Sequence, residues 1–398
     1  MKQKKSYAGR LSRVVAAIDV SPIKKMELLA RQTEGVISLA QGIPSFETPN
    51  HIKDAVKQAI DQDLCNRYTP GFGIEPLREA ICAKLKRDNN IVATTEQIVV
   101  THGAIQALMA IFIAILDDGA EIVILTPDYA THITQAIIAG RGHKPVLVPL
   151  DESRGWRFDS AALERAITKK TRALLLCNPS NPTGKTYTCD ELKEIASIAK
   201  KHGLFIIVDE MYEYFTFGDC QHTSIGSFPE VADQTISVFG VSKSYAMTGW
   251  RIGYLVAAKE LAYEIFKVQD SLITCPAAVS QYAALAALTG PHNIVSHFKG
   301  EFAKRRGIVM EMLKDSKRIS LVEPQGAYYA FLKLNFPVDD FAYAKEMLLQ
   351  AGVAAIPGSA FGLGGEGHLR VSFGVAEDRL REGMRRLIDY TENYPRKG

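Results

Sequence analysis

The amino-acid sequence predicts an α/β fold in which a mostly parallel sheet is covered by helices, followed by a smaller α+β domain. Between residues 98 and 239, short β-branched runs alternate with helical stretches, a pattern that builds a parallel sheet with helices on both faces. After Gly290 the rhythm changes to charged helical stretches and closely spaced strands. Apolar residues make up 47% of the 398 residues and charged residues 23%, which is typical of a globular protein and excludes a disordered chain.

The length suggests two to three domains of roughly 150 residues each. We expect residues 1–45 to form an N-terminal arm that packs on the small domain, because this segment lacks a core of its own. Residues 46–290 would form the large domain, and residues 291–398 would form the small C-terminal domain.

Elements of the large domain follow from β-branched runs and helical signals. The expected strands are Ile98–Thr101, Glu121–Leu125, Val146–Leu150, Arg172–Cys177, Leu204–Val208 and Thr235–Phe239. The expected helices are Ile105–Leu116, Thr131–Ala139, Ser160–Ile167 and Cys189–His202. The last helix has the clearest boundaries, because Thr188 and Glu191 form a capping box and Gly203 ends it.

The small domain has fewer elements. The sequence predicts a charged helix over His297–Lys314, two strands around Ala327–Leu334 and a helix over Asp340–Ala351. A strand over Leu369–Ser372 and a final amphipathic helix complete the domain.

Composition and spacing exclude several classes of function. The formal net charge of +3 is too mild to indicate nucleic acid as a partner. The longest apolar run, Ala107–Leu116, has ten residues, half of the ~20 that a membrane span needs. The nine histidines show no metal-ligand spacing, so we expect no metal site. The six cysteines contain no CxxC pair and indicate reduced thiols in a cytoplasmic protein.

The N-terminal sequence carries five basic residues and no acidic residue through Ile18. A secretory signal would need a longer apolar stretch. A surface-lying arm is the favoured interpretation, and a mitochondrial presequence is the alternative.

One strand-loop segment imitates the phosphate loop of an NTPase. Gly184-Lys185-Thr186 follows an apolar strand, and Val208-Asp209-Glu210 ends another, as the acidic strand of such enzymes does. The complete motif needs glycine where this chain has Pro179, and Pro182 lies in the same loop. Because a phosphate loop binds through backbone N–H groups, which proline lacks, this alternative is disfavoured.

Two other strand ends carry chemistry, and ligands of parallel sheets bind beyond such carboxyl ends. Asp209 ends an apolar strand, where a buried carboxylate needs a cationic or protonated partner. Lys243 follows another apolar strand, and a partly buried lysine can lose its proton and act as a nucleophile. Arg251, eight residues later, offers a planar cation suited to phosphate.

These residues lie in segments that resemble class I/II aminotransferases, the fold-type-I enzymes that depend on pyridoxal 5'-phosphate. The similar segments, in chain order, are Arg67–Gly71 with Leu77–Ala80, Asn181–Gly184, Val208–Tyr212, Gly240–Gly253 and Leu369–Phe373. The resemblance runs from about Ile37 to Tyr390. It implies a large cofactor-binding domain, and a transaminase that moves the amino group of an L-amino acid to a 2-oxo acid such as 2-oxoglutarate by a ping-pong mechanism.

The resemblance also implies roles around the cofactor ring. Lys243 would carry pyridoxal phosphate and, once displaced by the amino acid, would move the proton from the substrate Cα. Asp209 would keep the pyridine nitrogen protonated. Tyr212 and Asn181 would donate to the ring oxygen, and Tyr129 would stack on the ring.

For the phosphate, the resemblance points to the helix opened by Gly103, Ala104 and Ile105, because free N–H groups and the helix dipole favour an anion there. Arg251 would add its charge. Relatives often have a serine three residues before the lysine, where this chain has Gly240, and the hydroxyl of Ser242 would compensate.

Tyr68 is similar to a residue that reaches the phosphate of the neighbouring subunit in this family. The resemblance therefore implies a homodimer. The other expected partners are small amino acids and 2-oxo acids, with neither nucleic acid nor membrane.

Substrate binding would centre on Arg370, which would hold the α-carboxylate as a bidentate pair, helped by the backbone at Gly42 and the amide of Asn181. Every amino acid has this carboxylate, so the choice of amino acid is decided by residues that face the substrate side chain. Ile43 and Ile105, together with Tyr129, are apolar or aromatic candidates for that wall.

An apolar wall favours neutral aromatic or aliphatic donors over aspartate, because an unpaired carboxylate there would cost several kcal/mol. Relatives that prefer dicarboxylic substrates often have lysine or threonine in place of Ile105. Aspartate remains an alternative, served by an arginine of a second subunit or by a mobile arginine.

Two other enzyme classes share part of this pattern. A β-lyase or synthase on the same scaffold, which diverts the carbanion, is the main alternative. A pyridoxal-phosphate-binding transcription regulator would need a DNA-binding domain before Ile37, and about 36 residues do not hold one.

Overall fold

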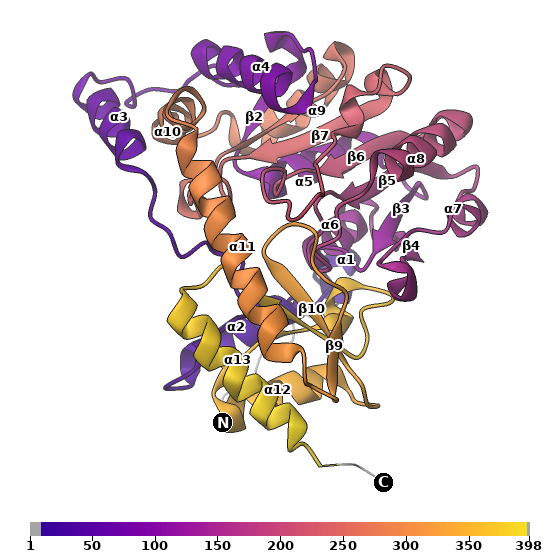
Figure 1. Cartoon of the computed structure of the whole chain (residues 1–398). Coiled ribbons are helices and arrows are strands. Elements are labelled where there is room, and N and C mark those ends of the chain that lie inside the picture. The colour runs from indigo at the N-terminus through magenta and orange to yellow at the C-terminus, as the bar shows by residue number, and fades with distance from the viewer. Residues whose placement is uncertain (1–8, 396–398) are drawn as a thin grey trace.

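The centre of the molecule is a seven-stranded sheet with the order β2-β8-β7-β6-β5-β3-β4 (Figure 1). The computed structural model describes residues 9–395 of the chain. The strands are β2 (Ile98–Thr101), β3 (Glu121–Thr126), β4 (Val146–Pro149), β5 (Thr171–Cys177), β6 (Phe205–Asp209), β7 (Thr235–Gly240) and β8 (Gly253–Val256). All neighbouring strands are parallel except β8, which runs antiparallel to both β2 and β7. The predicted α/β class and mostly parallel sheet are confirmed.

Alternate side chains of the central strands pack on helices of opposite faces. In β5, Leu174 and Leu176 are buried with the apolar side of α8 (Cys189–His202), whereas Ala173 and Leu175 are buried with α5 (Ala104–Ile115). Successive side chains of a strand point to opposite faces, so an apolar run is what a sheet covered on both sides requires.

The other helices of this region cover the sheet and its β2 end. They are α3 (Asn50–Asp61), α4 (Glu75–Asn89), α6 (Ala130–Ala139), α7 (Ser160–Ala166), α9 (Lys259–Ile273) and α10 (Ala278–Thr289). Helices α3, α4 and α10 enclose a core of their own against β2 and β8. The predicted capping box of α8 is present, because Thr188 Oγ1 accepts from the Glu191 amide and the Glu191 carboxylate accepts from the Thr188 amide.

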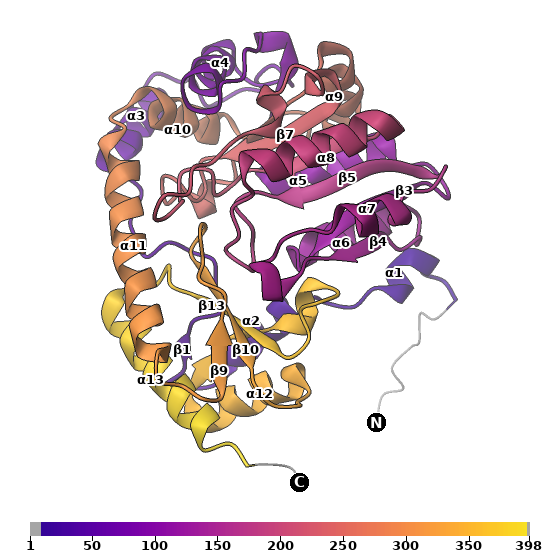
Figure 2. The same cartoon turned by 45° about the vertical axis from the view of Figure 1, so that its right-hand side comes forward.

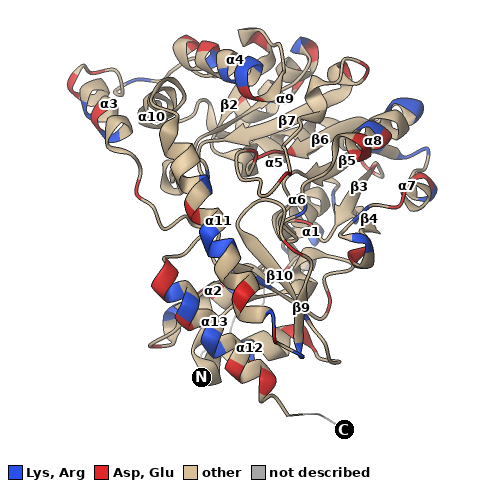
Figure 3. Ribbon diagram, viewed as in Figure 1, with Lys and Arg blue, Asp and Glu red and all other residues tan. Residues whose placement is uncertain are grey.

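A second, four-stranded antiparallel sheet has the order β12-β13-β10-β9 (Figure 2). Its strands are β9 (Ile319–Leu321), β10 (Tyr329–Leu334), β12 (Ile356–Pro357) and β13 (His368–Ser372). The helices beside it are α11 (Asn293–Leu313), α12 (Asp340–Ala351) and α13 (Glu377–Glu392). Figure 3 shows both signs of charge interspersed on these helices, and in α13 Glu377–Arg381 and Arg385–Asp389 form i,i+4 ion pairs.

The prediction of two strands around Ala327–Leu334 was wrong. Only β10 lies there, and its partner β9 precedes it by several residues. Ala327 has φ 58°, which no strand accommodates, and the amides of Gln325 and Gly326 donate to the carbonyl of Gly184. The first part of the segment is therefore a turn that contacts a loop of the large sheet.

The N-terminal segment joins the C-terminal part of the chain. It contains α1 (Arg13–Ala17), α2 (Pro22–Gln32) and β1 (Ile37–Ser38), and β1 pairs in parallel with β11 (Val353–Ala354). Helix α2 begins at the cap Ser21 and buries Met26. The division into an N-terminal arm, a large domain and a small domain, with boundaries at residues 45 and 290, stays a prediction.

Candidate active site

A cavity of about 310 Å³ lies where the carboxyl ends of β5, β6 and β7 face β10 and β13 of the second sheet. Nearly all the side chains predicted for the site line it. They are Gly42, Ile43, Ala104, Ile105, Tyr129, Asn181, Asp209, Tyr212, Ser242, Lys243, Arg251 and Arg370. Gly103 adjoins it through Arg251, whereas Tyr68 is 87% exposed and does not line it.

Lys243 follows β7 and directs its amine into the cavity. Its Nζ donates to the carbonyl oxygen of Gly42 at 2.6 Å. Burial, together with the nearby cations Arg370 and Arg251, lowers the pKa of this amine to about 8. A much larger share of Lys243 is therefore neutral near pH 7 than of an exposed lysine.

Asp209 has the cationic partner that a buried strand-end carboxylate needs. Its Oδ2 lies 3.2 Å from Nε2 of His132, whose Nδ1 lies 2.7 Å from Oδ2 of Asp128. Although burial opposes the charged form, the carboxylates of Asp128 and Asp209 raise the pKa of His132 to about 10. The imidazole is thus held as a cation between two acids. Sequence reasoning missed His132, and the available signal was the i,i+4 spacing of Asp128 and His132.

The start of α5 forms a cradle with Arg251. Gly103 is the N-cap of α5 with φ 78°, and a Cβ there would lie 2.7 Å from Nη2 of Arg251. Only glycine lets the guanidinium approach the helix N-terminus so closely. Nη1 of Arg251 donates to the carbonyl of Thr248 at 2.8 Å, and Thr248 also lines the cavity. Ser242 adds a hydroxyl to this end of the cavity.

Tyr212 and Tyr329 line the cavity together, and Tyr328 packs beside Tyr329. The hydroxyls of Tyr212 and Tyr329 are hydrogen-bonded at 2.8 Å, and the hydroxyl of Tyr328 donates to the carbonyl of Gly42 at 2.9 Å. Burial raises the pKa of Tyr212 well above its ordinary value, so its hydroxyl keeps its proton. Sequence reasoning missed Tyr329, which lies within the predicted strand region but in no recognised motif.

Arg370 on β13 is almost fully buried and only partly paired. Its Nη1 donates to Oδ1 of Asn181 at 3.0 Å, and its Nη2 donates to the carbonyl of Ala40. Its guanidinium lies 4.5 Å from the ring centre of Tyr329. Its Nε has no hydrogen-bond partner. A buried guanidinium with a free donor, and with no carboxylate at these contacts, suits an incoming carboxylate.

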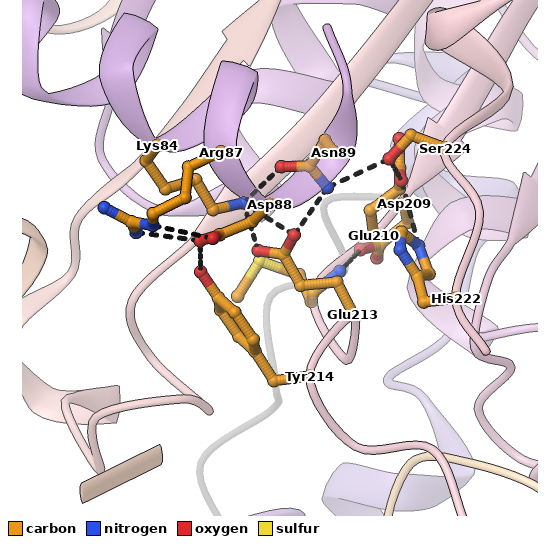
Figure 4. Close-up of polar contacts among 11 residues, drawn as sticks. Lys84, Arg87, Asp88, Asn89, Asp209, Glu210, Glu213, Tyr214, His222 and Ser224 are labelled. Atoms are coloured by element: carbon orange, nitrogen blue, oxygen red, sulfur yellow. Dashed lines mark hydrogen bonds and ion pairs between the residues drawn. The ribbon is translucent and has the colours of Figure 1, made fainter. Parts of the chain in front are cut away.

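The turn that follows Asp209 at the end of β6, and that carries Tyr212, is anchored by a buried polar network (Figure 4). Nζ of Lys84 donates to both oxygens of Glu213, at 2.5 and 2.6 Å, and to Oδ1 of Asn89 at 2.8 Å. Asn89 in turn donates to Glu213 at 2.7 Å.

The network continues from Asn89 to the residue next to Asp209. Nδ2 of Asn89 lies 2.9 Å from Oγ of Ser224, and this hydroxyl donates to the buried carboxylate of Glu210. Helix α4 therefore holds the turn after β6 at two points, directly at Glu213 and through Ser224 at Glu210.

The NTPase alternative gains no support from the structure. Lys185, which imitates the lysine of a phosphate loop, is buried and pairs with Glu191 at 2.8 Å. Across residues 9–395 we find neither a helix long and apolar enough to cross a membrane nor three or more His, Cys, Asp or Glu side chains grouped to hold a metal ion.

The α/β fold carries one cavity that contains both the amine of Lys243 and the buried guanidinium of Arg370. This combination defines an enzyme that acts on compounds with amino and carboxylate groups. Comparison with known proteins agrees. The model of the family "Aminotransferase class I and II" matches residues 34–387. The chain is 39% identical to an aspartate aminotransferase of Pyrococcus abyssi, over 93% of this chain and 95% of that protein. It is 38% identical to aromatic-amino-acid aminotransferase 2 of Thermococcus litoralis, over 95% and 97% of the two chains.

A solved structure gives the same result. The aromatic aminotransferase of Pyrococcus horikoshii superposes with a TM-score of 0.86 at 38% identity, covering 92% of this chain and 98% of that chain. The chain belongs to the class I and II aminotransferases and is a transaminase. This family depends in general on pyridoxal 5'-phosphate.

Proposed function

We propose that this chain binds pyridoxal 5'-phosphate in the cavity at Lys243 and transfers the amino group of an L-amino acid to a 2-oxo acid such as 2-oxoglutarate. The observation that carries the proposal is the amine of Lys243, which has a lowered pKa and shares one cavity with Asp209 and Arg370. When bound, the cofactor supplies an aldehyde and an electron-withdrawing ring.

The residues present fit this cofactor. The cradle of Gly103 and Arg251, with the N-terminus of α5 and the hydroxyl of Ser242, provides donors and positive charge for the phosphate. Asp209, paired with His132, offers a carboxylate to a protonated ring nitrogen. The 12-residue helix α5 is long enough for its dipole to contribute.

The remaining side chains bind and move protons. Lys243, whose lowered pKa leaves more of its amine neutral than that of an exposed lysine, takes the proton from the substrate Cα and returns it. Tyr212 keeps its hydroxyl proton and donates it in a hydrogen bond toward the ring oxygen, as does the amide of Asn181. Arg370 binds the α-carboxylate through the donor that lacks a protein partner.

For the amino donor, we propose neutral aromatic or aliphatic amino acids ahead of aspartate. Ile43 and Ile105 line the cavity with Tyr129, and such a wall gains ~25 cal/mol per Å² of apolar surface buried. The relatives include both an aspartate and an aromatic aminotransferase. The test is kcat/KM for phenylalanine, methionine and aspartate with one acceptor, and a tenfold advantage for aspartate over both others would contradict the proposal.

A homodimer is proposed for the assembly. Tyr68 is 87% exposed, and Ile60 and Leu64 before it are exposed apolar side chains, which suits a surface covered by a second copy. Sedimentation at assay concentration should give a two-fold dimer, and a fully active monomer would contradict this.

All six cysteines are free thiols, which supports a reducing compartment such as the cytoplasm.

The decisive experiment for the cofactor is Lys243→Ala. The variant should lose the pH-dependent absorbance of bound pyridoxal phosphate and most turnover, while circular dichroism stays native. Retention of both would remove Lys243 from its proposed role. Analysis of the products of the native enzyme separates transamination, which yields oxo acids and a new amino acid, from the elimination products of a β-lyase.

A further inference from the structure

The segment that joins β1 to α3 borders the cavity, and its residues Gly42 and Ile43 line it. Backbone hydrogen bonds fix this segment on either side of the two lining residues. The amides of Leu39 and Ser45 each donate at 2.8 Å, to carbonyl oxygens of β11 and of the loop after β13. The contacts made between these two points therefore decide where this part of the cavity wall lies.

Three side chains donate to backbone carbonyl oxygens between these points, counted over residues 9–395. Nη2 of Arg370 donates to Ala40. Nζ of Lys243 and the hydroxyl of Tyr328 both donate to Gly42, at 2.6 and 2.9 Å. In the proposed reaction the cofactor engages Lys243, and the substrate carboxylate engages Arg370. Tyr328 is the donor that takes part in neither binding step.

The ring of Tyr328 is held firmly, which makes its hydroxyl a fixed point. The ring is buried, and its centre lies 4.9 Å from that of Phe302 on α11 and 5.4 Å from that of Tyr212. The backbone carbonyl of Tyr328 accepts from the amide of Phe373 at 3.0 Å. Burial raises the pKa of Tyr328 well above its ordinary value, so the hydroxyl keeps its proton and remains a donor.

The two donors to Gly42 differ in what happens to them when the cavity is filled. Substrate displaces water, so a carbonyl oxygen of the wall then needs a donor from the protein. The amine of Lys243 leaves this carbonyl when it binds the cofactor aldehyde. The hydroxyl of Tyr328 stays, because its ring has no other role in the reaction.

We propose that Tyr328 is a positioning residue, whose hydroxyl holds the carbonyl of Gly42 in place after Lys243 has turned to the cofactor. Because Ile43 follows directly, its side chain is held against the substrate as well. This inference rests on the proposed transamination. It assigns Tyr328 to the tightness of substrate binding and leaves the proton transfer to Lys243.

The first test needs no cofactor, because Lys243→Ala removes the competing donor directly. Hydrogen exchange is followed by mass spectrometry in a peptide that covers residues 38–46 of the cofactor-free protein. Tyr328→Phe and Lys243→Ala alone should each stay within about twofold of the native rate, since one donor to Gly42 remains. The double variant should exchange about fivefold faster or more, since neither donor remains.

Tyr343→Phe is the matched control. Tyr343 is also buried, its hydroxyl is hydrogen-bonded to Thr391 at 2.7 Å, and it does not line the cavity. The substitution therefore removes the same chemical group from a buried ring at a remote place. Combined with Lys243→Ala, it should leave exchange in residues 38–46 at the rate of Lys243→Ala alone.

The second test measures substrate binding in the enzyme loaded with pyridoxal phosphate. With phenylalanine as donor, Tyr328→Phe should raise KM about fivefold, the effect of losing one neutral hydrogen bond, and leave kcat within about twofold. The Kd of 3-phenylpropionate, an unreactive analogue without the amino group, should rise by the same factor. Tyr343→Phe should change neither quantity.

A double variant that exchanges no faster than Lys243→Ala would overturn the role of Tyr328. An equal rise of KM in Tyr343→Phe would overturn it as well, and both results would leave the transaminase intact. If the native enzyme instead binds no pyridoxal phosphate and transfers no amino group, the proposed function fails. The exchange measurement separates these failures, because it uses neither cofactor nor substrate.

Discussion

Replacing Lys84 with methionine should lower the free energy of unfolding by about 3–5 kcal/mol, the usual cost of leaving a buried charge without its partner. The side chains of Lys84 and Glu213 are 1% and 5% exposed, and the ammonium makes three hydrogen bonds of 2.8 Å or less. Methionine keeps the apolar stem and removes the ammonium, with its charge and its three hydrogen bonds. Because native proteins are stable by only about 5–15 kcal/mol, the loss would be large.

Urea unfolding followed by circular dichroism and by tryptophan fluorescence measures this loss. Lys57→Met is the matched control, because Lys57 pairs with Asp54 at 2.9 Å but both are largely exposed, so at most about 1 kcal/mol should be lost. The double variant Lys84→Met with Glu213→Leu should regain most of the stability, since no unpaired charge remains.

Two results would refute this reasoning. A loss below about 1 kcal/mol in Lys84→Met would show that the network does not support the turn after β6. A double variant as unstable as Lys84→Met would show that the stranded carboxylate is not the source of the loss.

Three further predictions concern the cavity. The cofactor-free protein should bind pyridoxal phosphate covalently, and borohydride reduction traps this bond so that it can be measured. The trapped fraction should rise with pH around a midpoint near 8, because burial lowers the Lys243 pKa from its ordinary 10.5. A midpoint near 10 would contradict this. Asp209→Asn should reduce kcat/KM about 100-fold or more with native urea unfolding, and near-native turnover would make the carboxylate merely structural. Gly42→Ala would place a Cβ 2.0 Å from the Tyr329 hydroxyl, so it should break the Tyr212–Tyr329 hydrogen bond. The free energy of unfolding should fall by about 1–3 kcal/mol. An unchanged unfolding curve would show that Tyr329 moves aside without cost.

Much of the large sheet could be predicted because its signals are local. The strands read as apolar β-branched runs, and α8 carries its start and stop signals within its own sequence. Strand β8 was missed because its four residues directly follow the lysine segment and offer no alternation. The turn at Ala327 was missed because its positive φ is imposed by contacts with Gly184, a distant loop.

The residues of the cavity also divide into those that local signals predict and those that only long-range contacts bring to the site. Lys243 and Asp209 stand at strand ends, where topology alone predicts chemistry. The sequence also indicated that Asp209 needs a cationic partner, but not that this partner is His132, 77 residues away. The N-terminal segment joins the second sheet through the pairing of β1 with β11, and this long-range contact has no local signature.

The cavity joins the two ends of the chain, and this has a consequence for biosynthesis. Gly42 accepts a hydrogen bond from Lys243, 201 residues later, and Ala40 accepts one from Arg370, 330 residues later. On the ribosome, the N-terminal segment must therefore wait, unpaired, until β11 and β13 have emerged. A nascent chain that already contains Lys243 still lacks the arginine that binds substrate, so enzymatic competence arrives only as translation finishes.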